Sequence, residues 1–142
     1  MKPIQILTLL IFCSCLFSSC KINQHKNGLK TGKWIYKDTF MSITSESKGR
    51  YKKDLEVGIW KDYVGERLIS KRKYKDSICH TTEYHNNGQI RSFGFSKIIV
   101  DSTGLHWLLT GEWKFYDSEG VLLGTKMYEK GLPINETYFI ED

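Results

Sequence analysis

Apolar and polar residues alternate in short runs along most of the chain, and small turn-forming residues separate the runs. Gly, Asn and Asp stand at nearly every break, while no stretch beyond the first twenty residues keeps a helical period for ten residues. Period-two alternation between turn signals is the pattern of half-buried antiparallel strands. The sequence therefore predicts an all-β antiparallel meander of about eight to ten short strands.

Turn signals divide the predicted strands. Turns are expected at 27–28, near 54, and at 64–66, 76–77, 86–88 and 101–104. Strands are expected at 32–37, 48–53, 58–63, 67–75, 78–84, 90–100 and 133–140, with 105–109 leading into a unit at 111–122. Residues 39–47 alternate less regularly. Pro133 has no backbone N–H, which suits a terminal edge strand.

Parts of one motif recur along these runs. The fullest copy is Gly-Glu-Trp-Lys-Phe-Tyr-Asp-Ser-Glu-Gly-Val-Leu at 111–122, and Gly-x-Trp begins two other units. The predicted structural residues of the repeat are Gly32, Trp34, Gly58, Trp60, Tyr63, Tyr84, Gly88, Gly111, Trp113, Tyr116 and Gly120. The unit at 78–88 has Thr81 in the Trp position, and residues 97–109 look like an insertion. A chain of short near-copies predicts stacked units that bury one another, with insertions on a binding face.

Each Gly-x-Trp motif places a glycine inside a predicted strand, where it weakens the strand by roughly 0.5–1 kcal/mol relative to Ala. A repeated glycine therefore needs a physical reason. We expect an aromatic ring from a neighbouring strand to lie over the bare backbone of this glycine, two residues before each Trp.

The Tyr-x3-Gly-x-Leu, Tyr-x2-Gly and Gly-x-Trp spacing resembles the MORN-repeat family in its bacterial variant, over residues 28–131. The resemblance implies an elongated, twisted antiparallel sheet of stacked hairpin repeats with no enzymatic residues in the repeat. Members of the family are associated with membrane contact, phospholipid binding and protein scaffolding.

The N-terminus has the features of an export signal. Lys2 precedes an apolar run at 4–17 that is too short to span a bilayer comfortably. The sequence Leu-Phe-Ser-Ser-Cys at 16–20 resembles a bacterial lipobox, from which it departs at Phe17. We therefore expect a signal peptide at 1–19, a lipid anchor on Cys20, a tether at 20–26 and a repeat domain at 27–142. A secretory signal or an uncleaved anchor helix are the alternatives, and Cys13 and Cys15 are less suitable acceptors.

The composition suits one exported domain. The 142 residues carry a net charge of +5 and are 40% hydrophobic, and Cys79 is the one cysteine after the signal region, so no disulfide is expected within the domain. We expect a location in the cell envelope, anchored by lipid and facing the periplasm. Nucleic acid is not expected as a partner.

Candidate chemistry is sparse. Cys79 and His80 are adjacent on a predicted strand and so point to opposite faces, which prevents them from converging on one reacting atom. Neither the four histidines nor Glu112 and Glu119 have a spacing that enforces a metal site or a pair of catalytic carboxylates. No metal, cofactor or enzymatic activity is expected.

Basic and aromatic side chains are the better binding candidates. Lys48, Arg50 and Lys52 share one face of a strand, Lys71 and Lys73 share one face two strands along, and Trp107 lies in the insertion. If the two faces coincide, they form a positive stripe suited to anionic lipid or an acidic partner; otherwise these residues serve solubility. The sequence favours a membrane-anchored, non-catalytic scaffold for a protein, lipid or glycan partner. The alternative is a hydrolase of cell-wall glycan or lipid.

Overall fold

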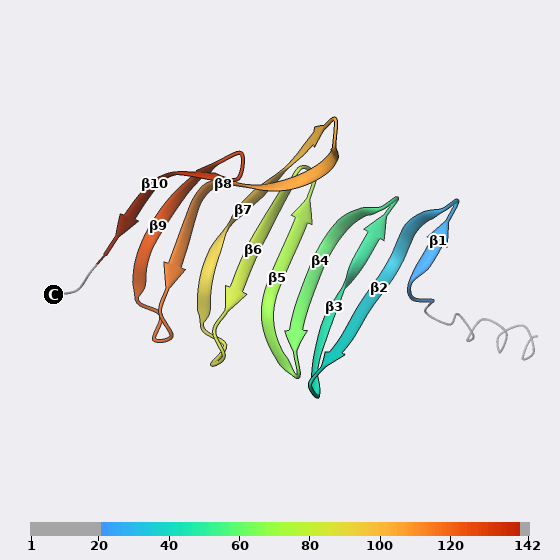
Figure 1. The fold of residues 1–142 in the computed structure, drawn as a ribbon, viewed down its shortest axis with the longest axis horizontal. Helices are drawn as coiled ribbons and strands as arrows, with labels where there is room; N and C mark the ends of the chain where they lie inside the picture. Colours follow the sequence, from blue (N-terminus) through green and yellow to red (C-terminus); the bar gives the residue numbers. More distant parts are fainter. Residues whose placement is uncertain (1–20, 140–142) are drawn as a thin grey trace, which may run out of the picture.

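The computed structural model describes residues 21–139, and these form one open antiparallel sheet (Figure 1). Each strand pairs with the next one in the chain, so the strand order in the sheet equals the order in the sequence. The strands are β1 (Gln24–Lys26), β2 (Leu29–Phe40), β3 (Ile43–Lys52), β4 (Leu55–Val64), β5 (Arg67–Lys75), β6 (Ile78–Tyr84), β7 (Ile90–Asp101), β8 (Gly104–Tyr116), β9 (Leu122–Glu129) and β10 (Leu132–Tyr138). The all-β meander predicted from the sequence is confirmed. The predicted signal peptide and the anchor residue Cys20 lie outside the described residues.

Tight turns connect most of the strands. The turns at Asn27–Gly28 and Lys53–Asp54 have positive φ at both central residues, as a two-residue type I′ hairpin requires. The main departure from the prediction is at residues 39–47, where a further hairpin turns at Met41 and Ser42. Neither residue is among the Asn, Asp and Gly that such a turn favours, so the sequence carried no hairpin signal there.

The chain joins the sheet before residue 27. Ile22 bridges to Lys33, and the amide side chain of Asn23 exchanges hydrogen bonds with the backbone N–H and C=O of Ile35 at 2.8 and 2.9 Å. β1 then pairs with the start of β2. The segment predicted as a free tether therefore contributes the first edge of the sheet.

The strand register shows why the Gly-x-Trp glycines recur. Gly32 pairs with Tyr51, Gly58 with Tyr74, and Gly111 with Tyr128. All three glycines have φ between 67° and 73°, and a Cβ built on any of them would meet no atom within 4 Å. The expectation that a ring covers these glycines is therefore wrong. They are needed because the backbone adopts a left-handed conformation that disfavours a side chain.

Rings do cover two other glycines, each in the strand preceding a Gly-x-Trp motif. A Cβ on Gly49 would lie 2.1 Å from the ring of Trp60, and a Cβ on Gly94 would lie 2.1 Å from the ring of Trp113. The Trp60 indole N–H donates to the carbonyl of Arg50 at 3.1 Å, and the Trp113 indole N–H donates to that of Phe95 at 2.9 Å. The ring therefore occupies the space of the missing side chain and is also held by the neighbouring backbone.

The register shifts at the same two places. Lys48 on β3 pairs with Lys61 on β4, and Arg50 on β3 pairs with Val57 on β4. An advance of two residues along β3 therefore corresponds to four residues along β4. The β7–β8 pairing shows the same shift opposite Gly94. These irregularities contain the left-handed Gly58 and Gly111, and they bring each Trp above the glycine of the preceding strand.

The buried side chains lie on one face of the sheet, which we call the aromatic face. It is defined by Trp34, Trp60, Tyr74, Cys79 and Trp113, which are between 2% and 8% exposed. The Tyr51 and Trp60 rings meet edge to face with centroids 5.0 Å apart. Burial raises the pKa of the Tyr51 and Tyr74 hydroxyls above their usual value, so both stay protonated at neutral pH.

The degenerate unit keeps the strand pairing of the first unit, although it has neither the Trp nor a left-handed glycine two residues before that position. Thr81 pairs with Gly94 as Trp34 pairs with Gly49, which confirms Thr81 in the Trp position. The Tyr-x3-Gly motif forms the same turn twice, at 85–89 and at 117–121, with equivalent backbone hydrogen bonds. The two turns also contact each other, because Asn87 donates from its side chain to the carbonyl of Ser118 at 2.7 Å.

The predicted insertion lengthens the β7–β8 hairpin, whose tip extends past the neighbouring strands and leans toward the β5–β6 turn (Figure 1). The backbone N–H of Ile98 donates to the carbonyl of Ser77 at 3.0 Å. Trp107 packs on Tyr74 with ring centroids 5.0 Å apart. Trp107 is therefore half-buried and takes part in core packing, whereas the sequence suggested an exposed ring for partner binding.

Candidate anion-binding face

The face opposite the aromatic face carries a row of lysines. Lys48 on β3 pairs directly with Lys61 on β4, and Lys61 pairs directly with Lys71 on β5. Directly paired residues of antiparallel strands point to the same side of the sheet, and neighbouring strands are about 4.8 Å apart. Three like charges therefore stand side by side across three strands.

More cations flank this row. Lys33 on β2 pairs directly with Arg50 on β3, and Lys73 on β5 pairs with Ile59 on β4. We call the resulting surface the basic face. Its members are Lys33, Lys48, Arg50, Lys61, Lys71 and Lys73.

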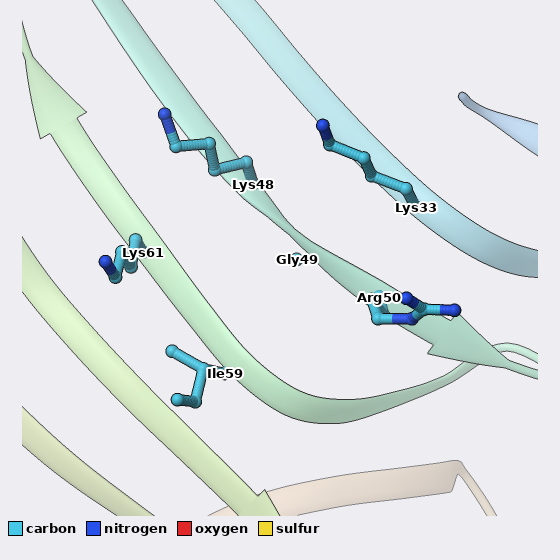
Figure 2. Close-up of a pocket in the computed structure, with 6 residues that line it drawn as sticks. All are labelled: Lys33, Lys48, Gly49, Arg50, Ile59 and Lys61. Atoms are coloured by element: carbon cyan, nitrogen blue, oxygen red, sulfur yellow. The ribbon is translucent and has the colours of Figure 1, made fainter. Parts of the chain in front are cut away.

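A shallow hollow lies within the basic face. Its volume is about 410 Å³, and four of the six residues around it are basic. They are Lys33, Lys48, Gly49, Arg50, Ile59 and Lys61. Figure 2 shows the side chains arranged around Gly49 from three adjacent strands. Gly49 contributes only backbone, so the glycine that admits the Trp60 ring on one face lies within a cationic hollow on the other.

One carboxylate, Glu46, partly compensates these charges. It forms ion pairs of 2.8 Å with Lys37 and with Lys48. Hydrogen bonds from these two lysines lower the pKa of Glu46 from 4.5 to about 2, and the same contact raises the pKa of Lys48. The Lys48 ammonium also lies 4.4 Å from the centroid of the Tyr63 ring.

The remaining cations of the basic face have no such partner. Within residues 21–139, no ion pair involves Lys33, Arg50, Lys61, Lys71 or Lys73. Like charges placed directly opposite each other on a sheet are destabilising. The face therefore carries a concentrated positive charge that an anion would relieve.

The structure brings most of the predicted basic residues together. Lys48, Arg50, Lys71 and Lys73 lie on this one face, while Lys52 lies at its margin, at the end of β3. Sequence reasoning missed Lys33 and Lys61, which complete the hollow. The sequence shows that Lys33 shares a strand face with Ile35 and Lys61 with Ile59, but only the register shows that Lys33 is paired with Arg50 and Lys61 with Lys48.

On the aromatic face, the main charged group is internally paired. Arg72 donates to both carboxylate oxygens of Asp62 at 2.9 and 3.0 Å and to the hydroxyl of Tyr74 at 3.2 Å. Ser47 donates to the same carboxylate at 2.5 Å. The charges of Arg72 and Asp62 therefore neutralise each other, although the buried Nε of Arg72 has no hydrogen-bond partner.

The other candidate groups do not converge. Cys79 is buried on the aromatic face, where burial raises the pKa of its thiol, whereas His80 is exposed on the basic side against Phe95. Glu112 pairs with Lys114 on an exposed surface, and Glu119 lies in an exposed turn. The described part of the chain has no cluster of three or more metal-binding side chains.

Comparison with family models, with curated proteins and with solved structures gives no match. In residues 21–139 there is also no helix with the length and apolarity needed to cross a membrane.

The Glu46 ion pairs predict a pH-dependent contribution to stability. Because the folded-state pKa of Glu46 is about 2 and its usual value is 4.5, the contribution is fully present above pH 4.5 and is lost as the pH falls toward 2. We expect Glu46→Gln to be less stable than the wild type in urea unfolding at about pH 7 and equally stable at about pH 2. An unchanged difference between the two pH values would contradict these pairs.

Proposed function

We propose that this protein is a lipid-anchored, non-catalytic interaction module of the bacterial cell envelope, which binds an anionic partner through its basic face. The lipid on Cys20 holds the sheet at a membrane, and the hollow around Gly49 receives acidic groups of the partner. The proposal needs neither a cofactor nor a reaction centre.

The observation that supports a binding role is the direct opposition of like charges. Lys48, Lys61 and Lys71 form two like-charge pairs in succession, and Lys33 and Arg50 form a third. A face whose purpose is solubility gains nothing from such pairing, because alternating signs on the same positions keep a sheet soluble without repulsion. A partner with closely spaced anionic groups turns this repulsion into attraction.

The anchor is supported by the sequence at 16–20 and by the way in which the chain reaches the sheet. Residue 22 already bridges to β2, so a lipid on Cys20 holds the first edge of the sheet close to the membrane surface. Several acyl chains on one cysteine provide essentially permanent attachment, because each buried CH₂ contributes about 0.8 kcal/mol.

Neutralising the central lysines tests the basic face. We expect Lys61→Gln and Lys71→Gln each to elute from immobilised heparin at lower salt than the wild type, and each to lower the slope of log affinity against log salt by about 1. Lys130→Gln, in the exposed β9–β10 turn, is the matched control and leaves elution unchanged. Vesicles containing phosphatidylglycerol form a second arm that separates lipid from glycan as the source of the anions. Equal binding of all three variants and the wild type in both arms would refute the role of the basic face.

Metabolic labelling tests the anchor. The wild type is expected to incorporate radiolabelled palmitate and to fractionate with membranes, whereas Cys20→Ala loses the label and the membrane association. Cys15→Ala is the control and keeps both. A Cys20→Ala chain that remains labelled would exclude this cysteine, and an unlabelled wild type would leave a secretory signal or an uncleaved helix as the means of export.

A further inference from the structure

Three apolar side chains at the tip of the β2–β3 hairpin are strongly exposed. Among the described residues, comparable exposure of apolar side chains occurs only in the β9–β10 hairpin and at the tip of the β7–β8 hairpin. Phe40 is 70% exposed, Met41 81% and Ile43 60%. Phe40 and Ile43 form the last directly paired residues of the hairpin, and Met41 occupies the turn itself. Three adjacent apolar side chains therefore project from the sheet without contributing to its core.

The backbone of this turn is unfavourable for the residues that occupy it. Met41 and Ser42 both have positive φ, at 46° and 64°. Turns of this shape strongly favour Asn, Asp or Gly, and the Asn27–Gly28 turn of the same protein follows that rule. Lys53 also departs from this preference in the β3–β4 turn, but Met41 in addition exposes an apolar side chain to water, and folding does not account for that exposure.

The β2–β3 turn lies at the same end of the sheet as the β4–β5, β6–β7 and β8–β9 turns, and it differs from them in composition (Figure 1). The β4–β5 turn is Gly65–Glu66, the β6–β7 turn contains residues 86–88, and the β8–β9 turn contains residues 118–120; all of them are glycine-containing and otherwise polar. Only the β2–β3 turn on this edge has an apolar residue at its apex.

The apolar tip and the point where residue 22 joins the sheet lie on the same strand, β2. Ile22 bridges to Lys33 on β2, and seven residues separate Lys33 from Phe40 along that strand, a distance of about 23 Å at 3.3 Å per residue. The strand that receives the chain from residues 1–20 is therefore the strand that ends in the apolar tip.

We propose that the β2–β3 tip inserts Phe40, Met41 and Ile43 into the acyl region of the membrane that holds the lipid on Cys20. This inference rests on the proposed anchoring. The lipid then holds the sheet near β1, its first edge strand, and the tip makes a second contact with the membrane. The end of the sheet that carries the β2–β3 turn therefore faces the membrane. The basic face then points sideways into the aqueous space and stays accessible to its partner.

The β7–β8 hairpin provides a matched comparison. Its tip also carries apolar side chains, with Val100 73% exposed and Leu105 43% exposed, and its two turn residues are Ser102 and Thr103. Successive hairpin turns of a meander lie at opposite ends of the strands, so this tip lies at the end of the sheet opposite to the β2–β3 turn (Figure 1). Only one of the two tips can enter a given membrane leaflet.

The experiment places an environment-sensitive fluorophore, NBD, on Ser42→Cys or on Ser102→Cys of the full chain, reconstituted in vesicles whose acyl chains carry bromine. We expect the label at residue 42 to shift to shorter wavelength and to lose most of its emission to the brominated chains. The label at residue 102 is expected to keep its emission and to remain sensitive to aqueous iodide.

Three results would overturn the insertion. A label at residue 42 that the brominated chains leave unquenched, on protein that floats with the vesicles, removes the insertion while the anchor stands. A label shielded from iodide but unquenched by bromine indicates that a second protein copy covers the tip. If the chain neither floats nor shows quenching with vesicles in excess, the anchor and the insertion both fail. Unfolding of Ser42→Cys in urea, compared with the wild type, verifies that the substitution leaves the hairpin folded.

Discussion

The contact on which this structure depends is that of a tryptophan ring lying against the bare backbone of a glycine in the preceding strand. It occurs at Trp60 over Gly49 and at Trp113 over Gly94, where no side chain fits beneath the ring. A single sheet has no second layer to cover its apolar side chains, so burial must come from rings lying flat on the sheet itself. Trp60 is only 2% exposed as a result, a degree of burial that otherwise requires a second layer packed on the sheet.

Three sequence features have to coincide for this contact. The covered glycine removes the Cβ, the left-handed glycine two residues before the Trp shifts the register, and a tyrosine pairs with that glycine from the following strand. Because each unit supplies one part to its neighbour, stability is shared between adjacent hairpins in the manner of a repeat protein. The unit with Thr81 in place of the Trp lacks one ring, and the long β7–β8 hairpin places Trp107 on Tyr74 beside it.

The main buried cluster therefore lies on one face, and the part of the second face formed by β2–β5 is available to charged side chains. The buried tryptophans and Tyr74 gather on the aromatic face, where Arg72 is neutralised by Asp62, while the lysines and Arg50 of β2–β5 lie on the other side with Glu46 as their counter-ion. Because one face holds the sheet together and the other is charged, a single thin sheet can present a binding surface. The proposed function therefore depends on the distance between like charges, which the spacing of the strands sets.

Much of the fold followed from local signals. The strands 67–75 and 78–84 and the turns at 76–77 and 86–88 were predictable, because alternation and turn chemistry are properties of neighbouring residues. The hairpin at Met41 was not, since its residues contradict turn preference. The role of Gly32, Gly58 and Gly111 was misassigned for a related reason: a left-handed φ and a covered backbone both select glycine, and the sequence alone does not separate them.

The same distinction between local signals and long-range pairing applies to the candidate site. Composition and alternation pointed to Lys48, Arg50, Lys71 and Lys73, but the row through Lys61 depends on a register shift that no local pattern reveals. Trp107 was misjudged because its partner, Tyr74, lies 33 positions earlier in the chain, and only the leaning hairpin brings them together.

The most direct test of the central contact compares two glycines that are needed for different reasons. Gly49→Ala and Gly58→Ala are both expected to destabilise the protein in urea unfolding, by about 1–3 kcal/mol from overpacking against Trp60 and by about 1–2 kcal/mol from the left-handed backbone, respectively. Asn tolerates a positive φ, so Gly58→Asn recovers part of the loss, whereas Gly49→Asn is at least as damaging as Gly49→Ala. If Asn recovers stability at Gly49, or if Gly49→Ala is neutral, the ring does not rest on that backbone and the account is wrong.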